Sequence, residues 1–71
     1  MTTAQRGIYE NIEKHETALR RGYETPQDAT FAIFAEIDRA YHAYVCGIGG
    51  RIDKRAALHK AFAMLAKITK E

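Results

Sequence analysis

The sequence has almost no cysteine, the residue with which many small domains form stabilising disulfides, and it has no long apolar run. Cys46 is the one cysteine among 71 residues, so no disulfide can form within the chain. A single free thiol is typical of a reducing compartment, and we expect a cytoplasmic protein. The residues from Met1 to Arg6 are polar, and no apolar run approaches the roughly 18 residues of a membrane span. We therefore expect neither a secretory signal nor a membrane span.

Strand patterns and repeats are missing as well. No window alternates polar and apolar residues, no segment recurs, and no tract is of low complexity. An all-α fold is therefore expected, and a chain this short forms one domain, residues 1–71. A domain of this size buries only about 60% of the surface that its unfolded chain exposes. Without a disulfide, its stability has to come from regular helix packing, a metal or a second subunit.

Charge is present in both signs but is unevenly distributed. The whole chain carries +2. The part up to Cys46 has five basic residues against seven acidic ones, a net −2, whereas the part from Gly47 onward has six against two, a net +4. The last third of the chain is therefore its basic part.

Capping signals and the spacing of apolar residues divide the chain into three helices, at about residues 3–21, 26–45 and 52–69. Thr2 is the expected N-cap of the first helix, with Gln5 at the spacing of a capping box, and Gly22 follows its end. Thr25 before Pro26 is the strongest start signal, because proline suits the first position of a helix. The glycines of residues 47–50 predict a reversal before the third helix.

The apolar residues of each predicted helix fall on one side of it. The first helix has a narrow stripe of Ile8, Ile12, His15 and Leu19, whereas the arcs of the other two are broader. In the second helix we expect the core arc to consist of Ile33, Phe34, Ile37, Ala40, Tyr41, Tyr44 and Val45. In the third we expect it to consist of Ala57, Leu58, Ala61, Phe62, Met64, Leu65, Ala66 and Ile68. Since the first helix cannot cover both arcs, we predict a small antiparallel three-helix bundle that forms a homodimer through the second and third helices.

A basic cluster marks the start of the third helix. Its members are Arg51, Lys54, Arg55, His59 and Lys60. Positive charge at a helix N-terminus opposes the helix dipole, so the cluster calls either for compensation by Asp53 or for a function. We predict that it binds a partner protein with an acidic surface patch. The alternative is a small DNA- or RNA-binding regulator that uses this basic helix start, although the total charge is low for such a protein.

Aromatic side chains on the second and third helices form a second candidate surface. Phe31 falls outside the main apolar arc of its helix and therefore needs cover. Tyrosine and phenylalanine favour protein interfaces. We predict an apolar interface, to a partner or to the second subunit, made of Phe31, Tyr41, Tyr44 and Phe62.

Asp38, His42 and Cys46 follow one another at four-residue spacing, which places an acid, an imidazole and a thiol on one stripe. The first and last of them lie ~12 Å apart along a helix axis, and no loop offers an oxyanion site, so we expect no catalytic residue. His15 or His59 could complete a metal site with Asp38 and His42, but the Glu-x-x-His spacing of helical metal sites is missing. We expect neither a metal nor a cofactor.

Elimination then leaves binding as the function. No phosphate-binding glycine loop, metal signature or convincing nucleophile is present. Our hypothesis is a small, dimeric, non-enzymatic helical module that acts as an adaptor or inhibitor by occupying the surface of a partner protein. Accessory proteins of phages and mobile elements fit this description.

Overall fold

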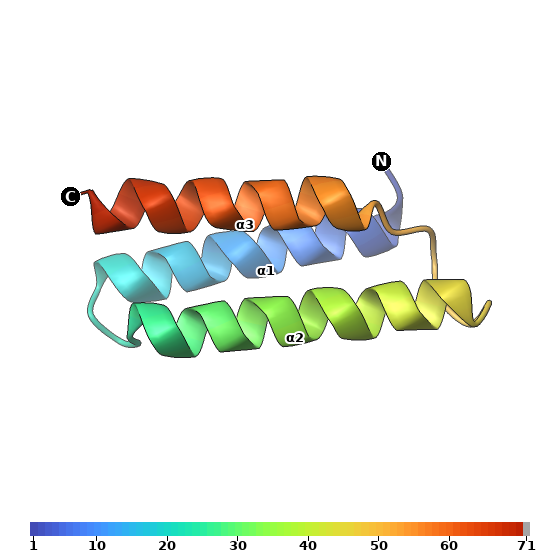
Figure 1. The fold of residues 1–71 in the computed structure, drawn as a ribbon, viewed down its shortest axis with the longest axis horizontal. Helices are drawn as coiled ribbons and strands as arrows, with labels where there is room; N and C mark the ends of the chain where they lie inside the picture. Colours follow the sequence, from blue (N-terminus) through green and yellow to red (C-terminus); the bar gives the residue numbers. More distant parts are fainter. Residues whose placement is uncertain (71) are drawn as a thin grey trace.

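The computed structural model describes residues 1–70, which form three helices and no strand: α1 (Thr3–Arg20), α2 (Pro26–Val45) and α3 (Lys54–Thr69). The helices lie lengthwise beside one another and alternate in direction (Figure 1), and each packs against the other two. The principal extents are 39 × 18 × 15 Å. The predicted all-helical, three-helix bundle is confirmed. No helix within the described residues has the length and hydropathy that a membrane crossing requires.

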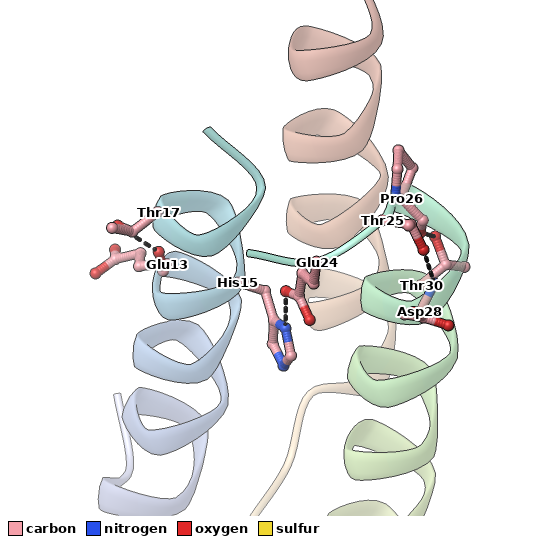
Figure 2. Close-up of polar contacts among 8 residues, drawn as sticks. All are labelled: Glu13, His15, Thr17, Glu24, Thr25, Pro26, Asp28 and Thr30. Atoms are coloured by element: carbon pink, nitrogen blue, oxygen red, sulfur yellow. Dashed lines mark hydrogen bonds and ion pairs between the residues drawn. The ribbon is translucent and has the colours of Figure 1, made fainter. Parts of the chain in front are cut away.

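The N-terminus of every helix is closed by the side chain of the residue before it. Thr2, Thr25 and Asp53 accept backbone N–H groups three residues on, at 3.1, 3.2 and 3.0 Å. Figure 2 shows the Thr25 hydroxyl pointing to Asp28 at the start of α2. These bonds satisfy donors that have no partner inside the helix, and the two threonine caps agree with the sequence prediction.

Two glycines end α1 and α2 in the same way. Gly22 and Gly47 have φ angles of 77° and 80°, the left-handed conformation that other residues adopt only with strain. The N–H of Ile48 then bonds the carbonyl of Ala43 at 3.0 Å, and that of Gly47 bonds the carbonyl of Tyr44 at 3.0 Å. These two hydrogen bonds form the Schellman motif, which satisfies the last carbonyl groups of a helix. The sequence therefore marked both ends correctly.

The hydrophobic core combines branched side chains from α1 and α2 with small ones from α3. Ile12, Ile33 and Ile37 are the largest fully buried side chains. The complete buried cluster consists of Ile8, Ile12, Ile33, Ile37, Ile52, Ala57, Ala61 and Met64. Alanine at two of the α3 positions lets that helix approach the isoleucines closely.

The predicted apolar arcs were partly wrong. Tyr44 and Val45 were expected in the core, but Val45 is 64% exposed, because the last turn of α2 extends past the first turn of α3 (Figure 1). Phe62 and Ala66 were also expected there, yet both are exposed. Both lie toward the outer side of α3, where Phe62 meets the Phe34 ring of α2 but stays 57% exposed, because a helix with two neighbours buries only the sides turned toward them.

The predicted start of α3 was two residues early. Ile52 and Asp53 lie before the helix, Asp53 as its N-cap. Ile52 is buried in the core although it belongs to the connection. At the end of α1, Arg21 is the cap rather than a helical residue, and such one- or two-residue differences are common at helix ends.

A buried glutamine joins the start of α1 to the segment before α3. Gln5 is only 6% exposed; its Nε2 donates to the Asp53 carbonyl at 3.1 Å, and its Oε1 accepts the Asp53 N–H at 2.8 Å. The Thr2 hydroxyl donates to the Arg51 carbonyl at 2.7 Å. The expected capping box is therefore wrong in its second half, because the Gln5 side chain is already bonded to Asp53 and does not return to Thr2.

Replacement of Gln5 by alanine should lower the free energy of unfolding by about 1–3 kcal/mol, because the part-buried Asp53 N–H would lose its partner and the Asp53 carbonyl would keep only the Ala57 N–H. Urea denaturation followed by circular dichroism measures this loss. The control is Gln27→Ala, which removes an exposed glutamine and should change stability by less than about 0.5 kcal/mol. Equal effects of the two substitutions would contradict this role for Gln5.

Candidate interaction surface

The structure separates the predicted basic cluster into groups that point in different directions. Lys54 turns toward α2, where its Nζ lies 3.1 Å from Asp38 Oδ1 and 5.1 Å from the centre of the Tyr41 ring. Lys60 turns toward α1, where its Nζ lies 3.7 Å from Glu13 Oε2 and 5.2 Å from the centre of the Tyr9 ring. Both lysines therefore hold α3 to its neighbours.

Arg51, Arg55 and His59 are the other three members of the cluster, and all are exposed. Arg51 lies in the connection before α3, whereas Arg55 and His59 lie one turn apart on the helix. Within residues 1–70 the structure assigns none of the three side chains an ion pair. Phe62 follows Arg55 at a spacing of seven residues, so the arginine and the phenylalanine point outward from the same side of α3.

Three phenylalanines form an apolar surface on α2 and α3, which we call the aromatic patch: Phe31, Phe34 and Phe62. Phe31 and Phe62 are 79% and 57% exposed. The rings of Phe34 and Phe62 meet edge to face, with centroids 5.2 Å apart and an interplanar angle of 72°. A shallow groove beside them is lined by α2 side chains that include Phe31, Phe34 and Asp38. Large exposed aromatic groups side by side are unusual on a surface that meets only water.

The predicted apolar interface residues occupy two places. Phe31 and Phe62 belong to the aromatic patch, whereas Tyr41 and Tyr44 form a separate edge-to-face pair with centroids 6.2 Å apart. Tyr41 is half-buried beneath Lys54. Sequence reasoning placed Phe34 in the core and missed its part in the patch, although its spacing of three residues from Phe31 puts the two on adjacent positions of one helix side.

The stripe of Asp38, His42 and Cys46 does not assemble as a nucleophilic set. The Asp38 carboxylate pairs with Lys54, while Cys46 Sγ lies 3.5 Å from His42 Nε2. Cys46 is the exposed C-cap of α2, and the partial negative charge at a helix C-terminus has the wrong sign to stabilise a thiolate. Among residues 1–70 the geometry therefore offers a weak thiol–imidazole contact, with the Asp38 carboxylate paired to Lys54 instead of orienting the imidazole.

His15 has a structural partner. Its Nδ1 lies 2.5 Å from Glu24 Oε1, and Figure 2 shows the imidazole of α1 reaching the carboxylate in the connection before α2. The contact fastens that connection to α1. Across residues 1–70, no three side chains of histidine, cysteine, aspartate or glutamate are arranged so that they could hold a metal ion.

The relation of α2 to α3 differs from that of a DNA-binding helix-turn-helix. In that motif two helices cross at about 90–120° and are joined by a turn of about three or four residues. Here α2 and α3 run side by side in opposite directions (Figure 1), and the connection covers residues 46–53. The start of α3 is therefore not presented as a recognition helix of that kind.

Comparison with protein-family models, with characterised proteins and with solved structures finds no match for this chain. The class of protein that the fold defines is a compact three-helix domain. The geometry of its surface is the basis for the proposal on its function.

The two groups of basic residues should respond differently to truncation. Lys60→Ala should lower the free energy of unfolding by about 0.5–1 kcal/mol, because it removes both the contact with Glu13 and the cation–π contact with Tyr9. Arg51→Ala is the control from the exposed group and should change stability by less than about 0.5 kcal/mol, because its side chain has no ion pair among the described residues. Chemical denaturation at low and high salt measures both, and a larger loss for Arg51→Ala would contradict this division.

Proposed function

We propose that this chain is a non-enzymatic protein-interaction module, an adaptor or an inhibitor, that binds a partner protein through the outer face of α2 and α3. The observation that carries the proposal is the exposure of Phe31 and Phe62 beside Phe34. Aromatic side chains of this size bury about 150–250 Å² each and often dominate the energy of an interface. Their position on rigid helices means that little order has to be imposed when they bind.

The charges around the aromatic patch indicate what the partner should offer. Arg55 lies on the same side of α3 as Phe62, exposed and without an ion pair in the described structure. Arginine forms two parallel hydrogen bonds with a carboxylate, and charge at the rim of an interface gives specificity. We therefore propose a partner surface that combines apolar side chains with a carboxylate. Self-association through α2 and α3 is part of this proposal, since the same helices carry the patch.

Nucleic-acid binding by the start of α3 is the competing proposal. It would use Arg51, Lys54, Arg55 and Lys60, but Lys54 and Lys60 already contact carboxylates of α2 and α1. Phosphate contacts make affinity fall steeply as salt rises, whereas an aromatic interface changes little. The two proposals can therefore be separated by salt dependence.

A photo-crosslinking amino acid at position 31 should form adducts with protein in the cells that produce this chain. The same group in place of Glu10, an exposed residue of α1, is the control and should give no specific adduct. Adducts are detected by gel electrophoresis and identified by mass spectrometry. Equal labelling from both positions, or adducts with nucleic acid alone, would contradict the proposal.

A further inference from the structure

The outer face of α2 and α3 carries two kinds of side chain at successive positions along the helix axes. We call these positions the aromatic level and the charged level. Phe34 and Phe62 meet across the two helices and define the aromatic level. The charged level begins one turn beyond Phe34, at Asp38, and extends to the first turn of α3, whose Lys54 reaches the Asp38 carboxylate with its side chain. Arg55 lies in that same turn, so this level carries a carboxylate on α2 and a guanidinium on α3.

Asp38 and Arg55, the two groups of the charged level, can both form further polar contacts beyond those made within one chain. The Asp38 side chain is 68% exposed in spite of its contact with Lys54, and a carboxylate can accept further hydrogen bonds with its second oxygen. Arg55 is exposed and has no ion pair among the described residues. One acceptor on α2 and one donor on α3 therefore remain available at one level.

We infer that the occupant of this face is a second copy of the chain, related by a two-fold axis that runs parallel to the helices. This inference rests on the proposed function, since it names the partner of the same face. Such an axis keeps every residue at its own level and lays α2 of each copy over α3 of the other. Asp38 then faces the partner's Arg55 on both sides of the axis, and the aromatic patch faces its own copy.

A different orientation of the two-fold axis does not bring Asp38 to the partner's Arg55. An axis across the helices lays α2 on α2, so Asp38 cannot meet the partner's Arg55. The parallel axis also gives antiparallel packing of α2 on the partner's α3, the usual geometry of helical bundles. A chain of 71 residues with a core of eight buried side chains gains most from such a partner. The second copy thus supplies the apolar surface and the carboxylate that the face requires.

Charge reversal tests this arrangement, because the proposed axis pairs position 38 with position 55 twice. Asp38→Lys and Arg55→Glu should each weaken self-association by about tenfold or more, since each places like charges opposite one another. An equimolar mixture of the two variants should recover the dimer, because both contacts are then between opposite charges. The double variant, with both substitutions in one chain, should also recover it.

Sedimentation equilibrium gives the dissociation constants, and circular dichroism checks that every variant is folded. Glu10→Lys reverses an exposed charge on α1 and should leave the dissociation constant unchanged. Because Asp38→Lys also removes the contact with Lys54, Asp38→Asn is the substitute if the lysine variant is less helical. It should weaken the dimer by a smaller factor and should not recover with Arg55→Glu.

Three results would overturn the inference: a wild-type chain that remains monomeric, single variants that associate as tightly as the wild type, or a mixture that stays monomeric. A monomeric wild type that still forms adducts from position 31 with another protein would remove the second copy as the occupant and leave the proposed function standing. Failure of both measurements would remove the proposed function as well.

Discussion

Close packing of Ile12, Ile33 and Ile37 fixes the rotation of the helices in this bundle, and most other features follow from it. These side chains are fully buried, and two of them lie on α2. Since successive residues of a helix are turned by about 100°, a buried Ile33 leaves Phe31 about 160° away, on the outer side of α2. The same reasoning applies to Phe62, which follows the buried Ala61. A three-helix bundle with this core therefore has to expose these phenylalanines, whatever their hydrophobicity.

The same rotation explains why the basic residues of α3 do not act together. Lys54 and Lys60 lie at the two edges of α3, where each can cover a tyrosine ring and reach a carboxylate on a neighbouring helix. Arg55 lies between these edges, on the outer side. The basic start of α3 thus contributes two residues to the framework and leaves the arginine for an external contact. A group of charges adjacent in sequence is divided by helical geometry into different roles.

Local signals in the sequence were sufficient for the architecture. Thr25 with Pro26, and Gly22 and Gly47 after the last apolar turns, place helix ends by chemistry that involves a few neighbouring residues. The bonds between Gln5 and Asp53 could not be predicted in that way, because they join residues 48 positions apart. The exposure of Val45 depends on where α3 begins relative to α2, which is also a property of the assembled fold. The patch was found in part, since Phe31 was marked as needing cover while Phe34 was assigned to the core.

Binding of a second copy to the outer face of α2 and α3 is tested most directly by amide proton–nitrogen correlation spectra over a dilution series. Such spectra report on every backbone amide in solution. If two copies meet at this face, concentration-dependent shifts should be confined to residues around Phe31, Phe34, Arg55 and Phe62, with none on the exposed side of α1. Spectra that are independent of concentration, or shifts centred on α1, would contradict binding of a second copy at this face.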